Sequence, residues 1–261
     1  MSARHGALAA LSLATLSLAL AFAARSSRAP AAEPSPSAQA FLAYGRSLFA
    51  RTKALMPAYV KANFSCSSCH LANGRRPHGL SLLGSYAGFP RWNARASRFI
   101  AVQDRIAECF LYSMNGKPPA YESREMIALT AYLASLATGV PVGSALPGQA
   151  LVPVVAAHAP DRLHGRVVFG RTCSACHGTS GMGTTAAPPL WGPSSFNTGA
   201  GMFREDTLSA FVRYNMPLGA KPNTLSAQNA ADVAAYVLSQ RRPPFHGHAP
   251  VIFRPQPAHF F

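Results

Sequence analysis

Two copies of one five-residue motif constrain this chain more than any other feature. The first copy is CSSCH at residues 66–70, and the second is CSACH at residues 173–177. The C-x-x-C-H spacing is typical of c-type haem attachment, because each thiol can form a thioether to the porphyrin while the next histidine reaches the iron. The motifs therefore predict two covalently bound haems c, attached and ligated by six residues (Cys66, Cys69 and His70; Cys173, Cys176 and His177).

A single zinc ion held by the four thiolates, or two disulfides, would also use these cysteines. Neither alternative explains the adjacent histidines or the sequence repeated around each motif. The repeat includes a G-x-x-x-F pattern, at residues 45–49 before the first motif and at residues 165–169 before the second. This pattern resembles the helix contact of class I cytochromes c, where a small glycine lets the first helix cross the last one closely. Its presence before each motif indicates an internal repeat.

The repeat predicts the domain organisation, since a chain of 261 residues suits two domains of roughly 100 residues each. We expect a mostly α-helical fold with two class I cytochrome c domains in tandem, each around one covalently attached haem. The N-terminal domain is assigned to residues 36–143, a linker to 144–160, the C-terminal domain to 161–243 and a tail to 244–261. Apolar spacing predicts that the last helices of the two domains cover residues 125–133 and 229–239.

Residues 1–32 are predicted to be a signal peptide and leader. Arg4 and His5 precede an apolar run over residues 7–24, and small-residue cut sites lie at residues 21–23 and 29–31. An uncleaved anchor is the alternative, because the run is just long enough to span a bilayer, but its many alanines and serines would make a weak anchor. Export agrees with haem attachment outside the cytoplasm, so we expect a periplasmic protein. The sequence indicates no integral membrane partner.

The charge balance limits the classes of partner. The chain has 24 Lys and Arg against 9 Asp and Glu, a formal net charge of +15. Such a balance favours an anionic small molecule or an acidic partner protein. Nucleic acid is disfavoured, because the sequence has neither a basic run with interleaved aromatics nor a nucleic-acid-binding motif.

Each iron needs a sixth ligand or an open position for chemistry. In the second half, Met216 stands before a proline, ahead of the last helix and 39 residues after His177. A class I cytochrome c has its distal methionine in such a position. The alternatives for this ligand are Met182 and Met202.

In the first half, the same 39-residue step from His70 reaches Cys109, which is the one cysteine outside the haem motifs. As a ligand, its thiolate would make the iron electron-rich and lower the reduction potential. The alternatives are a buried apolar thiol or an intermolecular disulfide, with Met114 or Met126 as the distal ligand. The spacing alone leaves these alternatives open.

Several segments resemble one family of enzymes. The most specific is RIAECFLYSMNGKP at residues 105–118, whose R-x-x-x-C-x-x-x-S-M-N-G pattern is far more specific than the haem motifs. Shorter matching segments follow along the chain (GVPVG at 139–143, PLWGP at 189–193, SFN at 195–197, GAGM at 199–202 and NMPLG at 215–219). Over essentially all of residues 40–243, the chain is similar to the dihaem thiosulfate dehydrogenases that form tetrathionate.

The resemblance implies roles for particular residues. Cys109 matches the family's cysteine ligand of the first haem, and Met216 matches the methionine ligand of the second. Arg95, Arg105 and Ser113 match active-site residues. Arginine suits such a site, because its planar fork donates charge-assisted hydrogen bonds to oxyanions, and cationic neighbours favour a cysteine thiolate.

The chain departs from the family pattern at two places. The segment NARA at residues 93–96 stands where the family often has R-A-R-S/G. Some family members have a lysine beside the distal methionine that can itself ligate the iron, whereas this chain has Asn215 there. The asparagine favours plain His/Met ligation of the second haem.

The resemblance also implies a reaction, in which two thiosulfates are joined to tetrathionate. Electrons would pass from the His/Cys-ligated haem to the His/Met-ligated haem, and then to an external acceptor such as a small cytochrome c or a high-potential iron–sulfur protein. The same chemistry can run in reverse as tetrathionate reduction. One alternative is a dihaem electron carrier of the cytochrome c4 type, with methionine at both irons. Another is a Sox-type thiosulfate-oxidising haem subunit, which also has a cysteine ligand but works in a complex.

Overall fold

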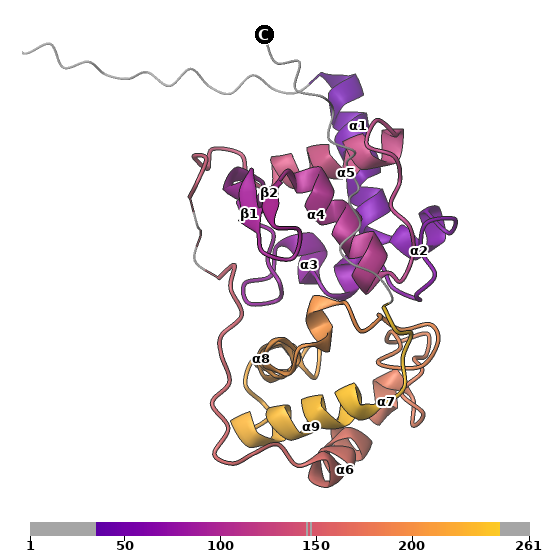
Figure 1. Ribbon diagram of the computed structural model, residues 1–261, viewed down its shortest axis with the longest axis vertical. Coiled ribbons are helices and arrows are strands. Elements are labelled where there is room, and N and C mark those ends of the chain that lie inside the picture. Colours follow the sequence, from indigo (N-terminus) through magenta and orange to yellow (C-terminus); the bar gives the residue numbers. More distant parts are fainter. Residues whose placement is uncertain (1–34, 145, 147, 246–261) are drawn as a thin grey trace, which may run out of the picture. The chain divides into compact units, whose positions relative to one another are not determined.

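The structure is a computed structural model that describes residues 35–144, 146 and 148–245. The predicted signal peptide and leader, and the predicted tail beyond residue 245, lie outside the described residues. Figure 1 shows two helical halves that follow one another along the chain. The mostly α-helical fold is therefore confirmed. No helix among the described residues has the length and apolar character needed to cross a membrane.

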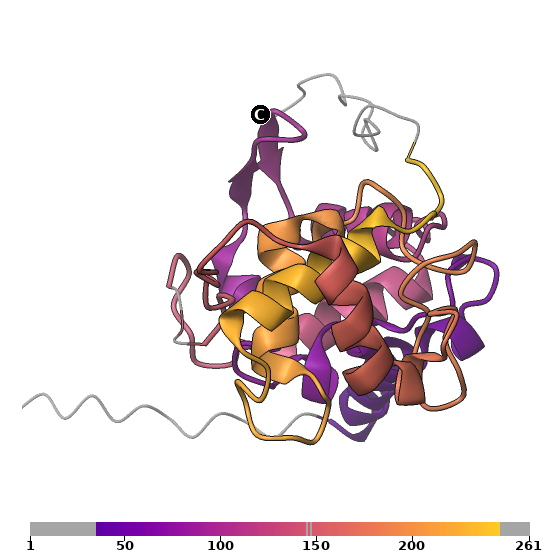
Figure 2. The same ribbon diagram turned by 90° about the horizontal axis from the view of Figure 1, so that it is seen from below.

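The first half contains more helices, turns and strands than the second. Its helices and turns are α1 (Pro36–Ala50), α2 (Thr52–Leu55), η1 (Cys66–Ser68), α3 (Leu71–Gly74), η2 (Ser85–Gly88), α4 (Val102–Glu108), η3 (Cys109–Ser113) and α5 (Arg124–Ser135). Its two strands, β1 (Arg91–Asn93) and β2 (Arg98–Ile100), pair antiparallel with Trp92 opposite Phe99. This hairpin projects from the helices (Figure 2) and carries one of the predicted arginines, Arg95, in its turn.

The second half is simpler. It consists of α6 (Arg162–Thr172), α7 (Ser174–His177), η4 (Gly201–Phe203), α8 (Glu205–Asn215) and α9 (Ala227–Ser239). Local sequence explains where its long helices begin, because the side chains of Asp161 and Ser226 accept hydrogen bonds from the first free N–H groups of α6 and α9. The predicted last helices at residues 125–133 and 229–239 lie within α5 and α9, as expected.

The first and last helices of each half cross at a glycine. A Cβ atom added at Gly45 of α1 would lie 2.2 Å from the carbonyl oxygen of Ala128 in α5. At Gly165 of α6 it would lie 2.0 Å from the carbonyl oxygen of Asp232 in α9. Only glycine allows backbones to approach so closely. The helix contact predicted from the repeated G-x-x-x-F pattern is confirmed in both halves.

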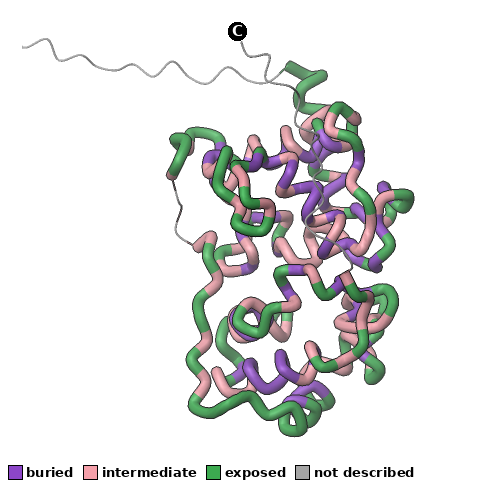
Figure 3. The backbone as a smooth tube through the Cα atoms, in the orientation of Figure 1, coloured by how far each residue is buried: buried purple, intermediate pink, exposed green. Residues whose placement is uncertain are grey.

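The phenylalanine of each pattern packs beside the crossing. The ring of Phe49 lies 5.3 Å from that of Tyr132, and the ring of Phe169 lies 5.6 Å from that of Tyr236. Such tilted aromatic pairs add to the energy of burying the rings. Buried residues line the inner faces of the crossing helices (Figure 3). The second haem motif follows directly after α6, whereas α2 and a loop separate the first motif from α1.

The two halves and the segment between them are hydrogen-bonded together. The N–H of Asn63 donates to the carbonyl of Ser194, 2.7 Å away. In the segment between α5 and α6, the carbonyls of Gly148 and Ala150 accept bonds of 2.8 and 2.9 Å from the backbone and ring of His78. The Asn63 bond joins the second half to the loop before the first haem motif, and the His78 bonds hold the connecting segment against the loop after it.

Candidate active site

Each motif histidine is oriented by a backbone carbonyl. The Nδ1–H of His70 donates to the carbonyl of Leu80 over 2.7 Å, and that of His177 donates to the carbonyl of Pro188 over 2.8 Å. This bond fixes the ring and leaves Nε2 as the nitrogen with a free lone pair. Burial also lowers the pKa of His70 to about 4, so its ring is neutral at pH 7. Both histidines therefore fit the role of iron ligand.

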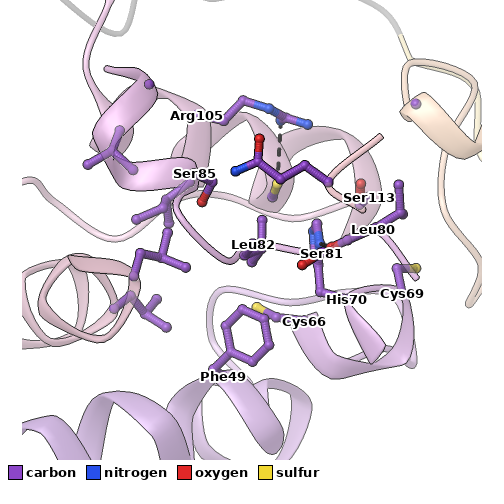
Figure 4. Close-up of a pocket in the computed structure, with 18 of the residues that line it drawn as sticks. Phe49, Cys66, Cys69, His70, Leu80, Ser81, Leu82, Ser85, Arg105 and Ser113 are labelled. Carbon is purple, nitrogen blue, oxygen red and sulfur yellow. Dashed lines mark hydrogen bonds between the residues drawn. The ribbon is translucent and has the colours of Figure 1, made fainter. Parts of the chain in front are cut away.

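A cavity of about 590 Å³ opens beside the first motif. This volume falls within the range of about 300–1,000 Å³ that is typical of ligand pockets. Cys66, Cys69 and His70 line it, together with apolar walls that include Phe49 and Leu129. Figure 4 shows Phe49 and Cys66 at one side of the cavity and Arg105 across it. The residues present thus fit a covalently attached haem.

Cys109 also lines this cavity, and it begins an unusual turn of helix. The regular helix α4 ends at Glu108, and residues Cys109–Ser113 form a π-helix. Such helices are rare in proteins, and those that occur often lie at functional sites. Arg105, one turn earlier, donates from Nη1 to the Cys109 sulfur over 3.4 Å (Figure 4). Electrostatic interaction with Cys109 is the main reason that the pKa of Arg105 is raised.

The structure also places the alternative ligands of the first iron. Met114 is buried and lines the same cavity, so it remains a competitor of Cys109. Met126 is fully buried on α5 and is not among the described residues that line the cavity. The contact with Arg105 distinguishes the sulfur of Cys109 from that of Met114, because a cation stabilises a thiolate.

A second, smaller pocket of about 210 Å³ adjoins the cavity. It brings together the three predicted active-site residues Arg95, Arg105 and Ser113, although Arg95 comes from the β1–β2 turn and the others flank Cys109. Arg105 and Ser113 line both spaces. We call the smaller space the anion pocket, because two guanidinium groups and a hydroxyl converge on it.

Arg95 is held in place although it lies on an exposed turn. Its Nη1 donates to the carbonyl of Gly199 over 2.9 Å, and its guanidinium carbon lies 4.3 Å from the ring centre of Tyr112. Gly199 belongs to the second half, so this half forms part of the pocket wall. Asn93 has a structural role in the turn, where its side-chain oxygen accepts the N–H groups of Arg95 and Ala96.

The sequence analysis missed several residues of the anion pocket. Glu108 lies beside Arg105 at 3.5 Å and accepts a 2.8 Å hydrogen bond from the Asn93 amide. A signal for Glu108 and Tyr112 was available in the 105–118 segment. They stand three residues after Arg105 and Cys109, respectively, a spacing that places side chains on the same face of a helix. Gly199 lies in the matched segment GAGM, but that match did not predict its contact with Arg95, which joins distant parts of the chain.

In the second half, the structure distinguishes among the three candidate methionines. Met216 is half-buried at the C-terminal end of α8 and packs against the core. Met182 is 55% exposed, and Met202 lines the cavity of the first half. The buried Asn215 donates to the carbonyls of His78 and Phe211 over 2.9 and 3.1 Å. These hydrogen bonds give its side chain a structural role rather than that of an iron ligand. Met216 stays the predicted ligand.

Comparison with known proteins identifies the domains. The family model described as "SoxA/TsdA, cytochrome c domain" matches residues 52–142, and the model described as "Cytochrome c" matches residues 163–241. The thiosulfate dehydrogenase of Allochromatium vinosum is 38% identical over 211 residues, which cover 77% of this chain and 78% of that protein. The chain belongs to the thiosulfate dehydrogenase family. It is an oxidoreductase with two cytochrome c domains in tandem and two covalently attached haems c, as the sequence predicted.

Other members of the thiosulfate dehydrogenase family agree. The enzyme of Stutzerimonas stutzeri is 40% identical over 205 residues, covering 76% of this chain and 66% of that protein. The solved structure of thiosulfate dehydrogenase TsdBA from Marichromatium purpuratum, in its "as isolated" form, has 34% identity and a TM-score of 0.76. The match covers 81% of this chain and 48% of that one, so the chain spans about half of the solved protein.

The similarity to Sox proteins is more limited. The L-cysteine S-thiosulfotransferase subunit SoxA of Pseudaminobacter salicylatoxidans is 31% identical over 81 residues. These residues cover 31% of this chain and 27% of that protein. The likeness is therefore confined to about one domain, whereas the thiosulfate dehydrogenases match both.

Proposed function

We propose that this protein joins two thiosulfates to tetrathionate at the anion pocket beside Cys109. The observation that carries this proposal is the convergence of Arg95, Arg105 and Ser113 on one pocket that adjoins the cysteine-lined cavity. The names of the relatives support thiosulfate as the substrate. A carrier of the cytochrome c4 type would need no such pocket.

The pocket brings two guanidinium groups together with one carboxylate, that of Glu108, and so has the net positive charge that suits this reaction. Thiosulfate is a dianion, so bringing two of them together means overcoming their repulsion. Arg95 and Arg105 offer planar sets of N–H donors that suit sulfonate oxygens, and the Ser113 hydroxyl offers one more donor. Arg105 also contacts the Cys109 sulfur, so it can hold a substrate oxygen close to that sulfur. Charge neutralisation and positioning are thus provided by the same residues.

Cys109 acts as the sulfur nucleophile in this proposal. The Cys109 thiolate and the terminal sulfur of the first thiosulfate form a disulfide bond, which gives a cysteine S-thiosulfonate and releases two electrons. The terminal sulfur of the second thiosulfate then attacks the sulfur that Cys109 has bound. The bond to the cysteine breaks, tetrathionate leaves and the thiolate returns. Atoms and charge balance without transfer of a proton.

The two released electrons need an acceptor in the protein. Each haem, when bound, accepts one electron, and a thioether ligand raises the haem potential relative to a thiolate ligand. His177 and Met216 would therefore hold the haem from which electrons leave, and Cys109 and His70 the haem at the substrate. We infer that an external carrier, such as a small cytochrome c or a high-potential iron–sulfur protein, receives the electrons in the periplasm. The same site can run in reverse as a tetrathionate reductase.

The test is a steady-state assay of the haem-loaded protein with thiosulfate and ferricyanide, with tetrathionate measured as product. Cys109→Gly should abolish turnover while both haems stay attached, because thioether formation uses the other four cysteines. Mass spectrometry of the intact variant checks the attachment. Turnover retained in this variant would refute the covalent role of Cys109. Reduction of ferricyanide without tetrathionate in the unmodified protein would instead favour the carrier.

A further inference from the structure

The π-helix that begins at Cys109 is hydrogen-bonded to a residue of the second half. Within this turn, the N–H of Met114 donates to the carbonyl of Cys109 over 2.9 Å, and that of Gly116 donates to Phe110 over 2.8 Å. The carbonyls of Leu111 and Tyr112 instead accept hydrogen bonds from one residue, Asn197. Asn197 donates from its side-chain Nδ2 to Leu111 over 2.8 Å and from its backbone N–H to Tyr112 over 3.2 Å.

The other end of the same side chain holds the loop that restrains Arg95. The Oδ1 atom of Asn197 accepts the N–H of Gly199 over 2.9 Å, and the carbonyl of Gly199 accepts Nη1 of Arg95 over 2.9 Å. A Cβ atom added at Gly199 would lie 3.1 Å from the ring of Tyr112 and 3.2 Å from Oδ1 of Asn197. The loop is therefore packed tightly against the π-helix.

Asn197 is well suited to such a connection because it is 2% exposed and uses both ends of its amide. A buried amide that is bonded at both ends restrains its partners more strongly than an exposed one, because no water is present to replace a broken hydrogen bond. One side chain thus joins the element that carries Cys109 and Ser113 to the loop that fixes Arg95.

We propose that Asn197 is a positioning residue for the thiosulfate site, through which the second cytochrome c domain completes the active site of the first. The inference rests on the proposed function for its substrate. Two dianions react productively only when both arginines stay at fixed distances from the Cys109 sulfur, and small displacements of such groups have large effects on rate. The second domain then has two roles, since it receives electrons and also shapes the pocket where they are released.

Two variants test the hydrogen bonds made by the two ends of the Asn197 amide. Asn197→Ala removes all three side-chain bonds, those to Leu111, Asn115 and Gly199, and we expect kcat/KM for thiosulfate to fall roughly 10- to 100-fold. Asn197→Asp keeps an acceptor for the N–H of Gly199 but loses the donor to Leu111 and Asn115. It should mainly disturb the π-helix and therefore the ligand signal of the first haem in electron paramagnetic resonance. The matched control is Asp232→Ala, which removes another buried, multiply bonded side chain of the second half at the α6–α9 contact.

The comparison of the Asn197 variants with Asp232→Ala can contradict the proposal. All three variants should lose thermal stability, but only those at Asn197 should raise KM and alter the first-haem signal, while the second-haem signal stays unchanged. The proposal would be overturned if Asn197→Ala and Asp232→Ala lost equal stability and had the same KM and the same first-haem signal. Asn197 would then have a purely structural role. If the unmodified protein makes no tetrathionate, the proposed function fails, and the first-haem signal still decides whether Asn197 positions Cys109.

Discussion

Arg105 lies where the two spaces of the site meet. It lines both the haem cavity and the anion pocket, and its guanidinium contacts the Cys109 sulfur at 3.4 Å and the Glu108 carboxylate at 3.5 Å. Glu108 is in turn held by Asn93 at 2.8 Å. The guanidinium is thus fixed from two sides before a substrate arrives, which reduces the entropy lost on binding.

Replacing Arg105 should therefore damage catalysis more than stability. We expect Arg105→Ala to lower kcat/KM for thiosulfate roughly 10- to 100-fold, the range for losing a hydrogen bond to a charged group. Arg105→Lys should restore only part of this, because an ammonium cannot form the planar fork. The measurement is the thiosulfate and ferricyanide assay, with Arg46→Ala on the exposed face of α1 as the matched control. Equal kcat/KM in the Arg105 and Arg46 variants would contradict this role.

The helices show which parts of the fold a sequence can predict. The crossings of α1 with α5 and of α6 with α9 were predictable, because the repeated glycine and aromatic residue indicate a place where two helix backbones approach closely. The π-helix was not, since residues 109–113 alone would suit a regular helix. It is stabilised by Asn197, far away in the chain, through the carbonyls of Leu111 and Tyr112. Tertiary contact of this kind leaves no periodic signal.

The helix crossing gives a prediction with an internal control on α6. Gly165→Ala places a Cβ 2.0 Å from the carbonyl oxygen of Asp232, so the helices must separate, and we expect a loss of about 1–3 kcal/mol in the free energy of unfolding. Gly170→Ala on the same helix meets nothing within 4 Å and should gain up to about 1 kcal/mol from helix propensity. Denaturant unfolding of the haem-loaded variants measures both. Equal shifts in the two variants would show that the crossing does not depend on glycine.

The whole molecule combines two cytochrome c domains that both contribute residues to the anion pocket. The haem motifs, both histidines and the active-site segment 105–118 were visible in sequence, because each is a short pattern. Asn197 and Gly199 lie in the matched segments SFN and GAGM, but the wall that they supply was not predicted, since it exists only when the two domains pack together. The domain that the sequence assigns to electron exit thus also contributes to the anion pocket.

The positive charge leads to a prediction at this scale, because the formal +15 includes only three arginines of the predicted leader, Arg4, Arg25 and Arg28. A strongly basic protein attracts a dianionic substrate, and salt screens this attraction because the Debye length falls from about 30 Å at 0.01 M to about 3 Å at 1 M ionic strength. We expect kcat/KM for thiosulfate to fall severalfold between these conditions. Ferricyanide is also an anion, so it must be kept saturating throughout. A value of kcat/KM that does not change with salt would show that long-range charge has no part in substrate capture.

The most direct test of the account is electron paramagnetic resonance of the oxidised protein, compared with that of Cys109→Gly. We predict a low-spin thiolate signal from one haem and a His/Met signal from the other, with the thiolate signal lost in the variant and the His/Met signal retained. Methionine ligation at both haems of the unmodified protein would contradict the central claim that Cys109 faces the first iron beside the anion pocket.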